Sequence, residues 1–137
     1  MYLFDTDILS NIVKKKPSSI LVEKLQHLSK TVQFTTSINI GEIYFGAYRS
    51  PRKTIILKAF REKVFPNVNI LSFDSESGRV FGLLKAELEK TGIGCSEPDL
   101  RIASIAIQHQ LFLITGNIKH FKLIPGLKIE NWLEEYR

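Results

Sequence analysis

Short apolar segments that end abruptly in polar residues constrain the fold of this chain more than any other feature. Tyr2–Phe4 runs directly into the sequence DTD at 5–7, and Leu111–Ile114 runs into TGN at 115–117. Such brief, continuously apolar runs are typical of strands that are buried on both faces of a parallel sheet. Strands are expected at 2–4, 32–35, 68–73, 111–114 and 128–129.

Helical patterns separate these segments. Ile40, Ile43, Tyr44 and Ala47, for example, have the i, i+3, i+4, i+7 spacing of a buried helix face. Strands that alternate with helices predict an α/β fold of three layers, in which a mostly parallel sheet of about four or five short strands carries helices on both faces. Helices are expected at 8–13, 20–28, 40–47, 51–65, 75–91, 98–107 and from Asn131 onward.

Length and composition agree with one globular domain. The chain has 137 residues, of which 44% are hydrophobic and 24% are charged. No linker-like segment divides it, so a single domain is expected over 1–137. Its 19 Lys and Arg residues against 14 Asp and Glu residues give a net charge of +5, which suits a polyanionic partner without requiring one.

The cysteine content and the hydropathy pattern indicate where the protein acts. A single cysteine, Cys95, excludes a disulfide framework and a cysteine-rich zinc site. It fits a reducing compartment, so a cytoplasmic location is expected. The chain reaches the carboxylate of Asp5 too early for a signal peptide. No stretch approaches the roughly 20 apolar residues of a membrane span, so no membrane partner is expected.

Carboxylates gather at the predicted edge of the sheet. In open α/β sheets, ligands bind beyond the carboxyl ends of the strands, and Asp5 follows the first strand. Glu42 and Asp99 lie on helices that are expected to pack nearby. Acids that converge from separate elements hold Mg²⁺ through their oxygens, and the ion stabilises the charge that builds on a phosphate during hydrolysis. The three acids therefore indicate metal-assisted phosphoryl chemistry.

Each acid also has a purely structural interpretation: Asp5 could simply end its strand, and the others could belong to helix caps. The candidate caps are Asp7 or Thr6 at the first helix, and the pairs Asn39–Glu42 and Ser96–Asp99, which have the spacing of a capping box. Caps are more common than catalytic acids, so the case for a site depends on the joint occurrence of the carboxylates. His120 is the histidine nearest to these acids, and a solvated side chain is its simpler interpretation.

Five motifs, in order along the chain, resemble those of PIN-domain proteins. They are DTDILS at 5–10, GEIYFGA at 41–47, PDLRIAS at 98–104, LITGNIKHF at 113–121 and IPGLKIENW at 124–132. The last of them looks like the ending of the VapC-type toxins within this family. Each motif is short, but the ordered set spans nearly the whole chain and is therefore specific.

The resemblance implies an RNA endonuclease that uses Mg²⁺ or Mn²⁺. Asp5, Glu42 and Asp99 would form its acidic, metal-binding core. Asn117 stands where family members often have an aspartate, and it would still supply an amide oxygen to the catalytic site. The residues expected around this core, in contact with it or with the substrate, are Asp7, Thr115 and His120.

The resemblance also implies three partners, namely an RNA substrate, a cognate antitoxin that blocks the site, and a second copy of the chain in a homodimer. Basic residues that could contact RNA phosphates are Lys14–Lys16, Arg49, Arg52, Lys53, Arg101, Lys119 and Lys122. For any one of them, a solvated surface charge is the simpler interpretation.

Two other functions compete with this interpretation. The segment FDTDIL at 4–9 also looks like the first motif of haloacid-dehalogenase-type phosphatases. The aspartate motif that must follow later is missing, because 116–137 contains no aspartate. The second alternative is a PIN fold that has lost catalysis and only binds RNA or a protein, and the departures at Asn117 and His120 allow it. Binding of Mn²⁺ to the metal-free protein would favour the enzyme.

Overall fold

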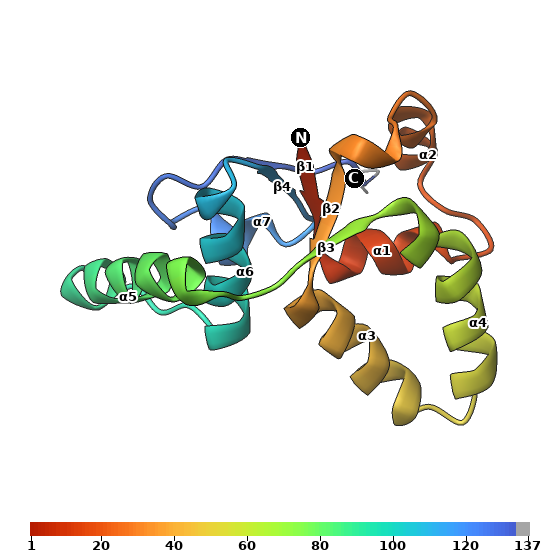
Figure 1. Ribbon diagram of the computed structural model, residues 1–137, viewed down its shortest axis with the longest axis horizontal. Coiled ribbons are helices and arrows are strands. Elements are labelled where there is room, and N and C mark those ends of the chain that lie inside the picture. The colour runs from red at the N-terminus through yellow and green to blue at the C-terminus, as the bar shows by residue number, and fades with distance from the viewer. Residues whose placement is uncertain (134–137) are drawn as a thin grey trace.

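The computed structural model describes residues 1–133 and contains a five-stranded sheet in which every pairing is parallel (Figure 1). The strands lie in the order β3-β2-β1-β4-β5, so the first strand of the chain is central. Their bounds are Tyr2–Phe4 (β1), Gln33–Thr36 (β2), Asn69–Leu71 (β3), Phe112–Ile114 (β4) and Ile129–Glu130 (β5). The prediction of a parallel α/β sheet is confirmed.

Helices cover both faces of this sheet. Their bounds are Thr6–Ile12 (α1), Ser19–Gln26 (α2), Ser37–Tyr48 (α3), Lys53–Lys63 (α4), Ser75–Lys90 (α5), Glu97–Gln108 (α6) and Ile118–Phe121 (α7), with short 3₁₀ turns at Lys30–Val32 (η1) and Phe65–Asn67 (η2). Helix α6 is buried on most sides, as its sequence predicts, and Ile102, Ala103 and Ile105 are inaccessible to solvent. Within residues 1–133, no helix is both long and apolar enough to cross a membrane.

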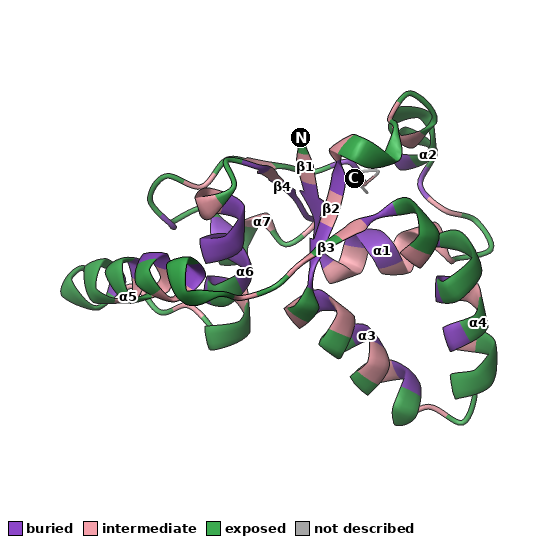
Figure 2. Ribbon diagram, viewed as in Figure 1, coloured by how far each residue is buried: buried purple, intermediate pink, exposed green. Residues whose placement is uncertain are grey.

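Two hydrophobic cores lie on opposite faces of the sheet, because successive side chains of a strand point to opposite faces. Leu3 pairs in register with Leu113, and both join the core formed with α5 and α6. Phe4 and its register partner Ile114 join the core formed with α1, α2, α3 and α4. Figure 2 shows buried residues along the central strands and on the inward sides of the helices. The three-layer prediction is confirmed.

Two predicted helix boundaries at prolines are wrong, and α3 begins at Ser37, three residues before the predicted start. Residues 51–52 form a turn and α4 begins at Lys53, so Pro51 does not start this helix. Pro66 lies inside η2 instead of directly ending α4. Proline fixes its own φ and disfavours helical geometry at the residue before it, a constraint that a turn or a 3₁₀ segment satisfies equally well.

The helix predicted from Asn131 is not formed over 131–133. The backbone N–H of Leu133 donates to Oδ1 of Asn131 at 2.9 Å. Local side-chain contacts of this kind let asparagine compete with the hydrogen bonds of a helix. Trp132 is buried nearby, edge-on to the rings of Tyr2 and Phe4. The rest of this prediction falls on 134–137, outside the described residues.

A tight loop between α5 and α6 fixes where α6 begins. Gly92 has a φ of 71°, and the hydrogen bonds around it are those of a Schellman helix ending. Glycine suits this position because it lacks the Cβ that makes left-handed φ costly. The predicted stop of α5 at Gly92 is confirmed. Ser96 then caps α6 by accepting from the backbone N–H of Asp99 at 3.3 Å, which places Asp99 in the first helical turn.

Candidate active site

The carboxyl ends of three neighbouring strands bring polar side chains to one edge of the sheet. Asp5 follows β1, Thr36 ends β2 and Thr115 follows β4. The backbone N–H of Asp5 donates to the carbonyl of Ile114 at 3.0 Å, which extends the pairing of β1 with β4. All three side chains are buried, and Asp5 is only 5% exposed. The polar edge that the sequence predicts is therefore a buried cluster.

Asp5 is held in place by three hydrogen-bond donors. Its Oδ1 accepts from the backbone N–H of Thr6 at 2.9 Å and from Nδ2 of Asn39 at 3.0 Å. Its Oδ2 accepts from the hydroxyl of Thr115 at 2.8 Å. Burial raises the pKa of Asp5, the charge of Asp99 raises it as well, and the hydrogen bonds only partly oppose the shift. The carboxylate is thus fixed in one orientation, in surroundings that a cation would stabilise.

Asn39 on α3 connects Asp5 to a second acid. Its side chain is fully buried, and its Oδ1 accepts from the hydroxyl of Thr36 at 2.6 Å. Its Nδ2 donates to Asp5 and also to the hydroxyl of Thr6, at 3.0 Å in each case. The Thr6 hydroxyl in turn donates to Oε1 of Glu42 at 2.6 Å. A chain of hydrogen bonds therefore leads from the end of β2 to two carboxylates.

Sequence analysis misses this role of Asn39, because it treats the residue as a helix cap. Thr36 is the actual cap of α3, and its hydroxyl accepts from the backbone N–H of Asn39 at 3.1 Å. The capping box proposed for Asn39 and Glu42 is therefore wrong. Thr36 is the feature of the sequence that could have indicated this network. It is a polar residue at the carboxyl end of a buried strand, next to the strand that carries Asp5.

Glu42 and Asp99 complete a set of three carboxylates. Burial raises the pKa of Glu42, and the charges of Asp5 and Asp99 add to the shift despite the hydrogen bond from Thr6. The side chain of Asp99 is 22% exposed, and its Oδ2 lies 3.5 Å from Nδ1 of His120. The three acids that the sequence singles out thus repel one another across the polar edge.

Asp7 lies beside this set, between α1 and the end of β4. Its Oδ2 accepts from the backbone N–H of Gly116 at 2.8 Å, whereas its Oδ1 is buried without a hydrogen-bond partner among residues 1–133. A Cβ at position 116 would lie 2.7 Å from Oδ2 of Asp7 and 2.9 Å from Cδ1 of Leu133, so this approach requires glycine. Asp5, and not Asp7 or Thr6, caps α1, which corrects the prediction made from sequence.

Replacing Asp7 with asparagine is expected to stabilise the metal-free protein at neutral pH. Burial, together with the charge of Asp5, raises the pKa of Asp7 from 3.8 to about 6. The wild-type fold therefore loses stability as the pH rises from about 4 to about 6, and Asp7→Asn escapes this loss. Because the carboxyl group is partly exposed, we expect a gain of about 1–2 kcal/mol above pH 7 and none at pH 4.

Urea unfolding in EDTA at pH 4 and at pH 7.5 measures this difference. Glu23→Gln is the matched control, because it removes the same charge from an exposed position. Equal gains from both variants, or a loss from Asp7→Asn at pH 7.5, would contradict the expected cost of burying the Asp7 charge.

The segment that follows β4 brings the remaining predicted residues to the rim of the cluster. The hydroxyl of Thr115, which donates to Asp5, also accepts from the backbone N–H of Asn117 at 3.0 Å. The Asn117 side chain is exposed and makes no hydrogen bond with the described residues. His120 on α7 faces Asp99, and its side chain is 63% exposed. Thr115 and His120 therefore touch two of the acids, whereas the side chain of Asn117 does not join the cluster.

Two basic residues near the acids differ in their surroundings. The guanidinium of Arg101 lies 3.3 Å from Oε2 of Glu97 and over the rings of Phe73 and Phe81, so it is directed toward α5. Lys119 lines a pocket next to Asp99. Of these two cations, Lys119 has no ion pair with a carboxylate among the described residues, whereas Arg101 is paired with Glu97.

The donor set fits a hydrated hard cation better than a closed metal cage. Among residues 1–133, no group of three or more acidic, histidine or cysteine side chains is close enough to enclose a metal ion unaided. Mg²⁺ in proteins usually keeps several waters and takes only one or two carboxylates. Asp5, Glu42 and Asp99 present such oxygens, and their mutual repulsion favours a bound cation.

Comparison with known proteins establishes the family. The family model described as PIN domain matches residues 2–127. The chain is a member of the PIN-domain family. Ribonuclease VapC2 of Haemophilus influenzae is 33% identical over 134 residues, which cover 96% of this chain and 98% of the relative. The tRNA(fMet)-specific endonuclease VapC of Salmonella typhimurium is 28% identical over 133 residues, covering 96% and 97%.

Solved structures of VapBC complexes share the fold of this PIN-domain chain. VapBC2 from Rickettsia felis, bound to a DNA fragment from its promoter, aligns with a TM-score of 0.87 at 32% identity and covers 96% of this chain and 98% of that chain. DNA-bound VapBC from Salmonella typhimurium aligns with a TM-score of 0.87 at 27% identity, covering 96% and 97%. The predicted VapC-type resemblance and the predicted endoribonuclease class are confirmed.

Proposed function

We propose that this PIN-domain protein is the toxin of a VapBC-type pair and hydrolyses phosphodiester bonds of RNA with Mg²⁺ or Mn²⁺. The observation that carries the proposal is the arrangement of Asp5, Glu42 and Asp99 at the end of the central strand, where the charge of Asp99 adds to the effect of burial and raises the pKa of both Asp5 and Glu42. Asp5 also caps α1, but capping does not require Glu42 and Asp99 to lie where their charges repel that of Asp5. Relatives named as ribonucleases align over 96% of the chain.

The carboxylates of Asp5, Glu42 and Asp99 are the proposed holders of the ion. When bound, such an ion lowers the pKa of a coordinated water and offsets the charge that develops on the phosphate. Thr115 and Asn39 orient Asp5 through their hydrogen bonds, so both oxygens of this carboxylate keep a fixed direction. This rigidity supplies the preorganisation that electrostatic catalysis needs.

Three further residues have supporting roles in this proposal. Asp7 holds the backbone of Gly116 and so steadies the segment that carries Thr115. His120 steadies Asp99 through their contact at 3.5 Å and lies where substrate approaches. Asn117 is exposed beside the cluster, where its amide oxygen is available to a metal-bound water.

The proposed protein partners are a cognate antitoxin that blocks the acidic site and a second copy of this chain. The support for the antitoxin is that the solved relatives from Rickettsia felis and Salmonella typhimurium are VapBC complexes. We place the protein in the cytoplasm, where a single free thiol persists and RNA is abundant. Light scattering coupled to size-exclusion chromatography measures whether the free chain is a dimer.

Cleavage of end-labelled RNA tests the enzymatic proposal. Purified protein is expected to cut single-stranded RNA in Mg²⁺ or Mn²⁺, to stop in EDTA, and to resume when the metal is restored. Calorimetric titration with Mn²⁺ is the companion measurement. If the protein neither cuts RNA nor binds Mn²⁺, the alternative function applies, a PIN fold that only binds RNA or a protein. If cleavage is unchanged in EDTA, the reaction does not depend on a divalent metal ion.

Asn117→Asp is expected to tighten Mn²⁺ binding by roughly tenfold, because it adds a charged oxygen ligand at the rim of the site. Its effect on the rate is a separate matter, since tighter binding of the ground state does not lower the barrier. Asn117→Ala distinguishes a functional side chain, whose loss slows cleavage, from a turn residue, whose loss affects only stability. Equal Mn²⁺ affinities in all three proteins would remove Asn117 from the site.

A further inference from the structure

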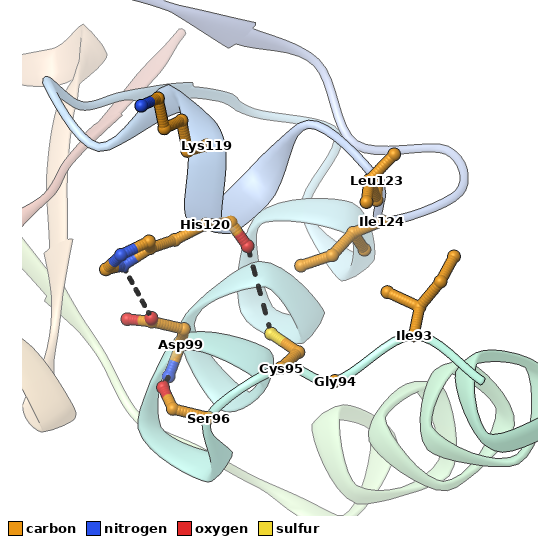
Figure 3. Close-up of a pocket in the computed structure, with 9 residues that line it drawn as sticks. All are labelled: Ile93, Gly94, Cys95, Ser96, Asp99, Lys119, His120, Leu123 and Ile124. Carbon is orange, nitrogen blue, oxygen red and sulfur yellow. Dashed lines mark hydrogen bonds and ion pairs between the residues drawn. The ribbon is translucent and has the colours of Figure 1, made fainter.

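A pocket of about 310 Å³ opens next to the acidic cluster, and Asp99 belongs to both (Figure 3). Its walls are the loop 93–96 that joins α5 to α6, the first turn of α6, and the segment 119–124 on and after α7. The volume is within the range of 300–1,000 Å³ that is typical of small-molecule sites. The function proposed above does not use this pocket beyond Asp99 and His120.

The pocket has a polar end and an aliphatic end. Figure 3 shows the side chains of Asp99 and His120 together on one side, and those of Ile93, Leu123 and Ile124 on the other. Leu123 is 54% exposed, whereas its neighbour Ile124 is buried in the core. The polar end is continuous with the acidic cluster, so a ligand that binds there also reaches into the aliphatic end.

The pocket wall is tied together across its two sides. Sγ of Cys95 donates to the carbonyl oxygen of His120 at 4.0 Å, and the imidazole of the same histidine contacts Asp99 at 3.5 Å. The segment on α7 is thereby joined to the loop before α6 and to α6 itself. The pocket is consequently formed in the free protein, as ligand sites usually are.

We propose that this pocket binds the base of the nucleotide adjacent to the scissile phosphate of a single-stranded RNA. The proposal rests on the proposed function, because the phosphate must lie at the acidic end. Lys119 also lines the pocket, and Figure 3 shows its ammonium group directed away from Asp99 and His120, so its side chain must rotate to contact a flanking phosphate. The base, which has two apolar faces, then lies against Ile93 and Leu123. Proteins that act on single-stranded RNA commonly take up such splayed bases in pockets.

Leu123→Trp, which fills the aliphatic end, tests the proposal, and Leu83→Trp on α5 is the matched control. Leu83 is 56% exposed and lines none of this pocket. The cleavage position in a mixed-sequence oligoribonucleotide is mapped first, and the bases beside it are then replaced one at a time by abasic residues. Values of kcat/KM in Mn²⁺ and oligonucleotide affinities in EDTA are measured for each combination of protein and RNA.

We expect one abasic position, directly beside the cut, to lower the wild-type kcat/KM and affinity by roughly tenfold or more, the value of one base contact. Leu123→Trp should show the same loss with the intact RNA and no further loss with that abasic RNA. Leu83→Trp should behave as wild type. If no RNA is cut, the abasic residue is placed at every position of the oligonucleotide in turn and the affinities in EDTA give the same comparison, so failure of the enzymatic proposal is distinguishable from failure of the pocket.

The proposal is overturned if Leu123→Trp binds and cuts intact RNA as the wild type does. It is also overturned if every abasic position behaves alike, since the pocket then reads no base. Should Leu123→Trp leave the RNA measurements unchanged and weaken only the inhibition by a protein antitoxin, the pocket belongs to that partner instead.

Discussion

Asp99→Asn is expected to lower the rate of RNA cleavage by roughly a thousandfold, the size of effect seen when one preorganised electrostatic group is lost from an active site. Asp99 is the clearest of the three acids to test, because its side chain is partly exposed and, among residues 1–133, its carboxylate has His120 as its one ion-pair partner, at 3.5 Å. Asparagine keeps the size and the helical position of the side chain. The variant therefore removes one charge, and with it one of the proposed metal ligands, with little change in packing.

Glu97→Gln is the matched control for this prediction. Glu97 lies in the same first turn of α6, and its carboxylate pairs with Lys85 at 3.0 Å and with Arg101 at 3.3 Å on the side of α5. We expect Glu97→Gln to keep its cleavage rate and its Mn²⁺ affinity, since exposed ion pairs contribute little. The free energy of unfolding, measured by thermal unfolding in EDTA, should differ by no more than about 0.5 kcal/mol between Asp99→Asn and the wild type.

Metal-dependent cleavage by Asp99→Asn at the wild-type rate would remove Asp99 from the site and leave the chemistry to Asp5 and Glu42. A large loss of stability in the same variant would instead indicate that the Asp99 side chain stabilises the first turn of α6, where the backbone N–H of Asp99 already donates to Ser96. The cleavage and unfolding measurements therefore separate the two roles of this residue.

The fold is largely predictable from sequence, because each strand carries its own local signal. Tyr2–Phe4 and Leu111–Ile114 are too short for helices, are continuously apolar, and stop at polar residues, which is the pattern of a parallel strand that is buried on both faces. The structure places both in the middle of the sheet, paired in register. Errors at Pro51 and at Asn131 arise because each residue is compatible with two local structures, a helix and a turn or loop.

The three acids could be predicted from the sequence for a related reason. The role of Asn39, which donates a hydrogen bond to Asp5, could not. Asp5 stands at the carboxyl end of a strand, where ligands bind in open α/β sheets, although the same residue also caps α1. Asn39 resembles an ordinary helix cap, and what distinguishes it is contact with Asp5, 34 residues away in sequence. Such a contact depends on how α3 packs against β1 and leaves no periodic trace in the chain. The pocket beside Asp99 is likewise a product of three separate segments.

Asn39→Asp is expected to be the most destabilising of the substitutions considered, at about 3 kcal/mol or more at pH 7 in EDTA. The wild-type amide donates to Oδ1 of Asp5 at 3.0 Å from a fully buried position. A carboxyl group there loses that donor and places a second negative charge against Asp5. Burial and repulsion raise the folded-state pKa of the new carboxyl group above its unfolded value, so the penalty is absent below about pH 4 and grows as the pH rises.

Two further variants separate charge from shape. Asn39→Ala removes the donor without adding charge, so it should cost about 1–3 kcal/mol with little dependence on pH. The double variant Asp5→Asn with Asn39→Asp exchanges the amide and the carboxylate and restores one donor and one acceptor between the two positions. We expect it to recover most of the stability that Asn39→Asp loses at pH 7, and to cut no RNA, because the carboxylate no longer occupies the strand end. If the double variant is as unstable as Asn39→Asp, like-charge repulsion with Asp5 is not the cause. The loss then belongs to hydrogen bonds, namely those that Asn39 makes with Thr36 and Thr6 and the one that Oδ1 of Asp5 accepts from the backbone N–H of Thr6.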